Sequence, residues 1–293
     1  MIIIYPNKIN WFYEERAIAI CSELRNLGFD AKSVPSNEIS AIERHNGIAL
    51  ILSMWESVTS AEWQGVGEEF LRVLRTIDRR ILVNYDCIFS QYFDRHFVHD
   101  DRLVTEIFDI CMAPQTDHPY IRSVPYTWVP EAFSASDFGS IQAWSHDRKI
   151  PWSMIGHGNR ERASLAAAVA RIMPTHGFVF LPPVRPYDER SGLGHKTVLD
   201  VLRQSDLYIW GSHHSYPYHE GLRALHAVFS GAAPAKIDPM HWKIFEAVPW
   251  VYPSVEALSN AVSERGVKSL YAEAKDFILS HKSLGNNIVA ALS

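Results

Sequence analysis

Short apolar runs of strand length alternate along this chain with segments of helical periodicity, and no other sequence feature restricts the fold as strongly. In the first half the apolar runs cover residues 2–5, 47–53 and 81–85, and residues 11–27 and 62–77 carry apolar side chains at helical spacing. Continuous apolar runs are typical of strands that are covered on both faces. Strands that alternate with helices form βαβ units, so the pattern predicts a doubly wound domain with a parallel sheet.

The alternation stops over residues 134–150, a stretch rich in Ser, Asp and Gly, and then begins again. Further strand candidates are residues 151–155, 178–181, 206–210 and 233–237, and residues 162–173 form an Ala-rich helix candidate. We therefore expect an α/β protein with two domains over residues 1–133 and 151–293, joined by a linker over 134–150. The simplest architecture places a cleft between the two domains.

Composition excludes several classes of protein. The chain has 293 residues, of which 47% are hydrophobic and 21% charged, as is ordinary for a globular protein with a sizeable core. The formal net charge of -5 supplies no global basic field, so we expect no nucleic-acid partner. Three cysteines without a Cys-x-x-Cys spacing suit a reducing compartment. Residues 1–6 resemble a first strand and not a signal peptide, and no apolar run is long enough to span a bilayer. These features predict a cytoplasmic protein.

Residues 205–231 combine a short apolar strand, a loop dense in His and Tyr, and a helix that begins just after Glu220 and Gly221. The loop therefore lies at the carboxyl end of a strand and at the amino end of a helix. Ligands bind at such strand ends in open α/β sheets. A helix start also offers free backbone N–H groups and a positive dipole end to an anion such as a phosphate. We predict the ligand site at this loop.

Three segments in order along the second half carry a resemblance to a known family. Residues 156–162 hold a Gly-containing turn and an Arg before a helix, and residues 202–209 hold Ser-Asp before an apolar strand. Residues 220–234 hold a Glu-Gly loop and an Ala-x-x-x-Gly-x-x-Pro helix end, and residues 129–133 are like a Pro-containing interdomain linker. The chain is similar to glycosyltransferases of GT-B architecture, in particular to the group-one type that includes the spore-maturation (CgeB-like) glycosyltransferase family.

This resemblance implies two Rossmann-like, doubly wound domains that face a cleft, with the acceptor on the N-terminal side and a nucleotide-sugar donor on the C-terminal side. It also implies a retaining sugar transfer without a cofactor or metal, in which cationic side chains and a helix amino terminus neutralise the leaving diphosphate. The sequence contains no Asp-x-Asp metal motif. His213, His214 and His219 suggest zinc, but adjacent histidines point apart and no further Cys or carboxylate stands at ligand spacing.

The resemblance and the position of the loop together select the candidate site residues. We predict Glu220 and His219 as catalytic residues, with Glu220 accepting hydrogen bonds from sugar hydroxyls. The alternative for Glu220 is an ordinary carboxylate in the first turn of a helix. One of Arg160 and Arg162 would contact the diphosphate, and the alternative is a solvated helix start. The donor-binding candidates are Gly156, Arg160, Arg162, Ser212, His213, Gly221, Leu222, Arg223 and His226.

His226 marks a departure from the family pattern. The family commonly carries a second Glu on this helix, which binds the nucleotide ribose, and His226 stands at that place relative to Ser230 and Gly231. An imidazole can exchange one hydrogen bond with a hydroxyl. Because His226 shares a helix face with Leu222 and Phe229, the alternative is a buried core histidine.

The first half has no motif that matches the family. Asn7 and Lys8 follow its first strand in place of a Gly-x-Gly-x-x-Gly, so a dinucleotide site of the usual type is not expected there. If this half binds a second substrate, Trp55, Glu56 and Asp86 are the strand-end residues to test.

Two other functions are compatible with the same residues. A nucleotide-sugar or glycan-binding protein would bind the donor without turnover, and an epimerase of the same architecture would convert the nucleotide-sugar without an acceptor. The sequence leaves open the donor base, the sugar and the acceptor, which can be a glycan or a small molecule.

Overall fold

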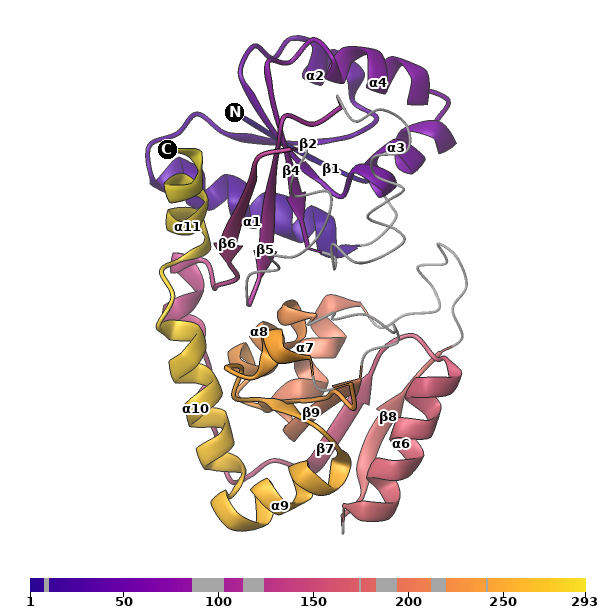
Figure 1. The fold of residues 1–293 in the computed structure, drawn as a ribbon, viewed down its shortest axis with the longest axis vertical. Helices are drawn as coiled ribbons and strands as arrows, with labels where there is room; N and C mark the ends of the chain where they lie inside the picture. Colours follow the sequence, from indigo (N-terminus) through magenta and orange to yellow (C-terminus); the bar gives the residue numbers. More distant parts are fainter. Residues whose placement is uncertain are drawn as a thin grey trace. The chain divides into compact units, whose positions relative to one another are not determined.

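The computed structural model describes residues 1–7, 11–85, 103–112, 124–173, 175–182, 194–211, 220–240 and 242–293. The chain forms two compact units (Figure 1). The first unit comprises Met1–Ala135 and Lys282–Ser293, and the second comprises Ser136–His281.

The first unit contains a six-stranded sheet whose recorded strand pairs are all parallel, in the order β2-β1-β3-β4-β5-β6. Its strands are β1 (Ile2–Tyr5), β2 (Lys32–Pro35), β3 (Ile48–Leu52), β4 (Arg79–Asn84), β5 (Glu106–Cys111) and β6 (Tyr126–Pro130). Its helices are α1 (Trp11–Asn26), α2 (Ile39–Glu43), α3 (Met54–Trp63), α4 (Gly67–Leu74) and α11 (Leu284–Leu292).

Both faces of this sheet are buried, as the continuous apolar runs predicted. Ile2 and Ile4 pack with side chains of α2, α3 and α4 in one core cluster, whereas Ile3 packs with side chains of α1 and α11 in another. Successive side chains of a strand point to opposite faces, so three apolar residues in a row need cover on both sides. The alternation of strands and helices in the sequence therefore corresponds to a doubly wound fold.

The second unit contains a parallel five-stranded sheet in the order β11-β10-β9-β7-β8. Its strands are β7 (Ile150–Ile155), β8 (Gly177–Phe180), β9 (Ser205–Gly211), β10 (Ala233–Ile237) and β11 (Val251–Tyr252). Its helices are α6 (Arg160–Ile172), α7 (His195–Arg203), α8 (Gly221–Phe229), α9 (Val255–Arg265) and α10 (Val267–Leu279), with short 3₁₀ turns η2 (Ala135–Ser140) and η4 (Lys243–Phe245).

The division of the chain differs from the sequence expectation at both ends of the second domain. The last twelve residues, expected in domain 151–293, belong to the first unit because Leu284 and Ile288 of α11 enter the core beside α1. The carboxylate of Glu23 on α1 also accepts from the backbone N–H groups of Ala135 (2.9 Å) and Gly285 (3.3 Å). Of the expected linker over residues 134–150, residues 134 and 135 belong to the first unit and residues 136–150 to the second.

Two helix predictions are corrected by local backbone geometry. Residues 62–77 form no single helix, because α3 ends near Gly65, which has a φ of 75°, and α4 then begins at Gly67. A left-handed glycine ends a helix because the following amides turn back to its last carbonyls. The sequence also favours a helix over residues 242–248, but these residues contain only the 3₁₀ turn η4.

Each sheet has one point at which the strand order reverses. In the first unit β1 lies between β2 and β3, and in the second unit β7 lies between β8 and β9. The helices that follow the two strands at such a point cross to opposite sides, which leaves space beyond the strand ends where ligands bind in this class of sheet. Topology thus singles out the carboxyl ends of β7 and β9 in the second unit.

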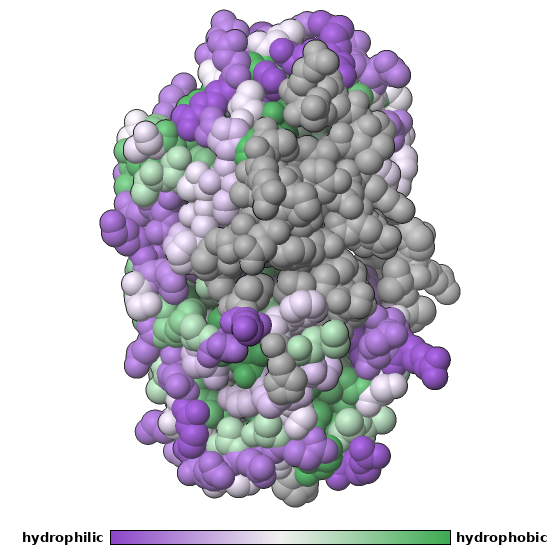
Figure 2. Space-filling model, viewed as in Figure 1, coloured by the Kyte–Doolittle hydropathy of each residue, from purple (hydrophilic) through white to green (hydrophobic). Residues whose placement is uncertain are grey.

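The described helices do not include one with the length and apolar character to cross a membrane. On the face seen in Figure 2, hydrophilic residues predominate over the coloured surface, with hydrophobic residues in groups among them.

Candidate functional site

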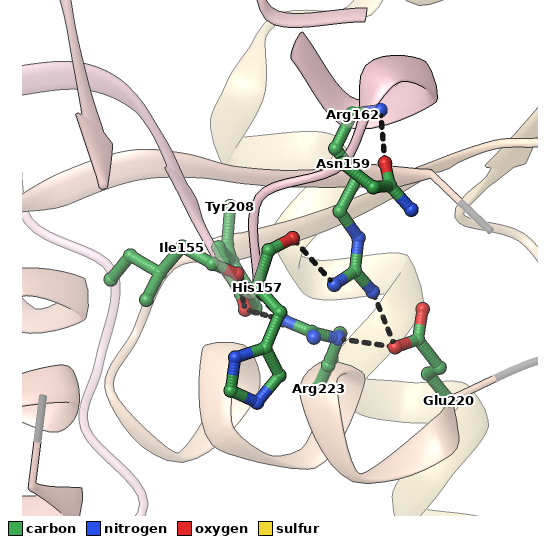
Figure 3. A network of polar contacts seen from close by, with 7 residues as sticks. All are labelled: Ile155, His157, Asn159, Arg162, Tyr208, Glu220 and Arg223. Carbon is green, nitrogen blue, oxygen red and sulfur yellow. Dashed lines mark hydrogen bonds and ion pairs between the residues drawn. The ribbon is translucent and has the colours of Figure 1, made fainter. Parts of the chain in front are cut away.

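The candidate site of the second unit is built by the segment that follows β7 and by the start of α8. The segment runs from Gly156 to Asn159 and leads into α6, and Glu220 directly precedes α8. The segment and Glu220 lie at the carboxyl edge where the strand order reverses. The sequence predicted a ligand site at this strand end, and the fold brings the 156–162 segment to the same place (Figure 3).

Glu220 is the centre of a buried ion-pair network. Its Oε1 atom accepts from Nη2 of Arg162 at 3.0 Å and from Nε of Arg223 at 2.9 Å. The side chain of Glu220 is 8% exposed, that of Arg162 5%, and that of Arg223 21%. Two cations therefore meet one carboxylate oxygen, and Arg223 is the more accessible of the two.

Backbone carbonyls at the end of β7 fix both guanidinium groups. Nη1 of Arg223 donates to the Ile155 carbonyl at 2.7 Å and also to the Tyr208 hydroxyl, which itself donates to Ile155. Nη1 of Arg162 donates to the His157 carbonyl at 3.1 Å. These bonds hold the guanidinium planes in place before any ligand arrives, as Figure 3 shows. Among the described residues, no acceptor is recorded for Nη2 of Arg223.

The network joins the amino termini of two helices. Asn159 caps α6, because its Oδ1 accepts from the backbone N–H of Arg162 at 2.8 Å. Glu220 stands at the N-cap of α8 in the left-handed region, with a φ of 52°, and its side chain does not cap the helix. Each helix start adds a partial positive charge to the excess of cations over anions in the network. The site is therefore electrostatically suited to an anion.

The network shifts the pKa values of its members. Burial alone would lower the pKa of Arg223, but the charge of Glu220 and the Tyr208 hydroxyl outweigh it, and the net pKa is raised. Arg223 is thus a permanent cation. Burial, reinforced by the charges of Arg162 and Arg223, lowers the pKa of His157, so its imidazole is neutral at neutral pH.

Two glycines let the loop after β7 pack closely. A Cβ on Gly156 would lie 3.1 Å from Nη1 of Arg162 and 3.3 Å from Nη2 of Arg223, so this glycine makes room for both guanidinium groups. A Cβ on Gly158 would lie 2.5 Å from the carbonyl oxygen of Leu181. The backbone N–H of Gly158 donates to Pro182 at 2.6 Å, which holds the loop against the segment after β8.

The Ala-x-x-x-Gly-x-x-Pro segment, which carried part of the family resemblance, ends α8 in the second unit. The N–H of Gly231 bonds to Val228, the N–H of Ala232 bonds to Ala227, and Gly231 has a φ of 76°. This pattern is a Schellman motif, which needs a residue tolerant of the left-handed region. Arg148 donates to the carbonyls of Ser230 (2.9 Å) and Leu202 (2.9 Å), near the carboxyl ends of α8 and α7.

The structure places the predicted residues as follows. Arg162 is not the solvated helix-start residue of the alternative, because it is buried and bound to Glu220, and its contact with the diphosphate stays a prediction. Arg160 is exposed in the first turn of α6. Gly221 is buried and Leu222 half-buried in the first turn of α8. Ser212, His213 and His219 lie outside the described residues, as does His214.

Glu220 and His226 have more specific environments than the sequence predicted. The Glu220 carboxylate is bound by arginines and not simply placed in a helix dipole. His226 is half-buried on α8, and its ring lies 4.9 Å from that of His195 on α7 at an angle of 36°. This contact to a second aromatic ring was not expected, and the assignment of His226 to ribose stays a prediction.

His157 and Tyr208 belong to the site but were not among the predicted site residues. Tyr208 sits inside an apolar strand, and only the register of β7 and β9 brings its hydroxyl to Ile155. His157 stands between two glycines in a loop, a setting that in retrospect signals a close approach to other groups. In the described part of the chain, His, Cys, Asp and Glu side chains form no group of three able to hold a metal ion.

In the first unit, Trp55 and Glu56 lie in the first turn of α3, next to the reversal point of the sheet, and Asp86 lies outside the described residues. Glu56 accepts from the hydroxyl of Ser53, which has a φ of 51°. Ser53 and Glu220 are the non-glycine residues with positive φ among those described. Both stand at the start of a helix beside a reversal point.

A separate buried charge cluster lies at the carboxyl edge of the first sheet. Nη2 of Arg16 lies 3.8 Å from Oε1 of Glu131, and Nε of Arg16 donates to the Tyr85 hydroxyl at 3.3 Å. Glu131 is 2% exposed. Burial raises the pKa of Glu131 to about 7, the charge of Arg16 opposes this shift, and the charge of Asp109 adds to it.

We expect the Glu131→Gln substitution to flatten the pH dependence of folding. The folded protein holds a proton on Glu131 that the unfolded chain, with the ordinary value of 4.5, releases. The free energy of unfolding therefore falls as pH rises from about 4.5 to about 7, by roughly 3 kcal/mol from this group. Urea unfolding at about pH 5 and about pH 8 measures the difference. Glu68→Gln, at an exposed position of α4, is the control. If stability changed equally with pH in the wild type and in both variants, the result would contradict the assignment to Glu131.

Comparison with known proteins supports the fold assignment. No family model and no curated protein matches the sequence of this chain. An alpha-glucosyltransferase solved in complex with UDP-glucose and DNA containing an abasic site is similar in structure, with a TM-score of 0.60 and 9% identity over 99% of this chain and 97% of that one. The spinosyn rhamnosyltransferase SpnG is similar with a TM-score of 0.50 and 12% identity over all of both chains. The same enzyme has also been solved with thymidine diphosphate. The chain has the two-domain α/β fold of GT-B glycosyltransferases.

Proposed function

We propose that this protein is a glycosyltransferase that moves a sugar from a nucleoside diphosphate sugar to an acceptor, and that the second unit binds the donor. The observation that carries the proposal is the network in which Arg162 and Arg223 converge on Glu220 between the amino termini of α6 and α8. The fold supports it, because the similar structures named above include enzymes solved with UDP-glucose and with thymidine diphosphate.

Cleavage of a bond from a sugar to a diphosphate leaves negative charge on the departing phosphate. Preorganised cations and N–H groups stabilise such charge best, because they need no reorganisation during the reaction. We assign the phosphate contact to Arg223, the more exposed guanidinium, and to the N–H groups in the first turn of α8. Arg162 and Glu220 act as positioning residues that hold Arg223 in its orientation.

The finer features of the proposal rest on the sequence resemblance. We propose a retaining, metal-independent reaction of the group-one GT-B type, in which the protein's own cations neutralise the diphosphate. The acceptor, a glycan or a small molecule, binds to the first unit. Trp55 and Glu56 are the residues to vary in that unit, since they follow a strand at its reversal point.

A panel of UDP, GDP, TDP, ADP and CMP in a thermal-shift assay tests the proposal. A ligand that binds the native state raises its stability by about 2.7 kcal/mol at a concentration of about one hundred times Kd. We expect one nucleoside diphosphate to raise the Tm. Arg223→Met should weaken its binding about tenfold or more, the effect of losing a hydrogen bond to a charged group.

Arg171→Met, at the exposed carboxyl end of α6 in the same unit, is the matched control and should bind like the wild type. The nucleotide-sugar of the base that binds is then incubated with and without candidate acceptors. Transfer supports the proposal, whereas binding without turnover identifies a binding protein, and conversion without any acceptor identifies an epimerase. Stabilisation by no member of the panel would contradict a donor site in this unit.

A further inference from the structure

His157 lies where the donor diphosphate is proposed to bind. It occupies the loop between β7 and α6, and its backbone carbonyl holds Nη1 of Arg162 at 3.1 Å. The residue as a whole is exposed, in contrast to the buried Arg162 that it contacts. The backbone of His157 is therefore tied into the ion-pair network (Figure 3), while the residue itself is exposed.

The charges that face His157 come from two helices. Helix α6 contributes Arg162 and α8 contributes Arg223, and Glu220 at the N-cap of α8 is bound to both guanidinium groups, whereas the neighbouring Asn159 and Tyr208 are neutral. Partial burial of the imidazole first, and then the positive charges of Arg162 and Arg223, lower the pKa of His157. In the free protein the imidazole is therefore neutral at neutral pH.

A bound diphosphate bridge reverses this balance. It brings two negative charges next to the two guanidinium groups, and an opposite charge within about 4–6 Å favours the charged form of a titratable group. In the free protein the two guanidinium charges disfavour an imidazolium at His157. In the complex the negative charges of the phosphates favour it. Proton binding and donor binding are thereby coupled, and by linkage each favours the other.

We propose that His157 takes up a proton when the donor diphosphate binds, and that the resulting imidazolium donates a hydrogen bond to a phosphate oxygen as a third cation beside Arg223 and Arg162. This inference rests on the proposed function, because it assigns a role within the same donor site. His157 would then bind the donor and a proton together. It also makes donor affinity decrease as pH rises, since the proton becomes less available.

The uptake is measured by isothermal titration calorimetry with UDP-glucose, TDP-glucose and GDP-glucose. Each phosphate of these donors carries one ester bond and shares the anhydride bond, so neither has the ionisation near pH ~6 that a terminal phosphate has. Titrations in two buffers with different heats of ionisation report the number of protons bound. We expect uptake of up to about one proton per donor near neutral pH, and a Kd about tenfold larger at about pH 8 than at about pH 6.

Three variants test whether His157 is the group that titrates. His157→Asn should abolish the proton uptake. Its donor affinity should be the same at all pH values and equal to that of the wild type at about pH 8. His157→Lys carries a fixed charge, so it should bind without uptake and with the affinity that the wild type has at about pH 6. His176→Asn removes an exposed histidine in the same unit and should behave like the wild type.

The outcomes separate the two proposals. Donor binding without proton uptake, or uptake that persists in His157→Asn, would overturn the role of His157 and leave the donor site standing. Failure of all three donors to bind the wild type and His157→Lys would overturn the donor site, and with it this inference.

Discussion

Replacement of Glu220 by Ala is expected to destabilise the second unit by about 3–5 kcal/mol, the usual cost of removing one partner from a buried ion pair. Arg162 and Arg223 would then face each other without the carboxylate that joins them. Their mutual repulsion should displace Arg223 and remove donor binding. The loss of binding and the loss of stability therefore have one cause.

Chemical unfolding measures the stability, and hydrogen exchange in β7 and β9 shows whether the change is in the second unit. Glu256→Ala is the matched control, since it removes an exposed carboxylate from the first turn of α9. The double variant Glu220→Ala, Arg223→Met should be more stable than Glu220→Ala alone, because one unpaired cation is gone. An effect of Glu220→Ala as small as that of the control would mean that Glu220 is only a helix-end carboxylate.

The second large effect is expected for Gly231→Ala, at roughly 3 kcal/mol of destabilisation. Gly231 has a φ of 76°, and the left-handed region costs an alanine about 1 kcal/mol. Its new Cβ would also lie 2.9 Å from the carbonyl oxygen of Ala143 and would meet Nη2 of Arg148, and such overpacking costs typically about 1–3 kcal/mol. Arg148 would have to leave the carbonyl of Ser230.

Gly65→Ala separates the two contributions. Gly65 ends α3 with the same pair of backbone hydrogen bonds, has a φ of 75°, and has no heavy atom within 4 Å of a Cβ added there. This variant should show only the backbone cost, about 1 kcal/mol. Thermal unfolding of both variants gives the comparison. Equal losses of stability would show that the contact between Gly231 and the 143–148 segment is not tight.

The loop within residues 205–231 illustrates how far sequence reasoning reached into the site. Its place between an apolar strand and a helix start predicted a ligand site, and the structure puts Glu220 at the edge where the strand order reverses. Local pattern was sufficient to place Glu220 between a strand and a helix start, because strand and helix propensities are properties of short segments. The roles assigned to the donor-site residues stay predictions until ligands are tested.

Arg162 shows where sequence reasoning stopped. From the sequence it is one of two arginines at a helix start, and solvent or a phosphate were the alternatives considered. Its partner Glu220 stands 58 residues away, and only the adjacency of β7 and β9 brings the two together. The pairing of parallel strands through crossover connections is a long-range property that the local pattern does not encode.

The alternation of apolar runs and helical segments determined that this chain folds as two doubly wound α/β units, because continuous apolar strands need cover on both faces. Only the tertiary structure decided that α11 returns to the first unit, that Tyr208 and His157 join the site, and that Arg162 is buried against Glu220. Each of these depends on contacts between segments distant in sequence, where packing and charge pairing outweigh local propensity.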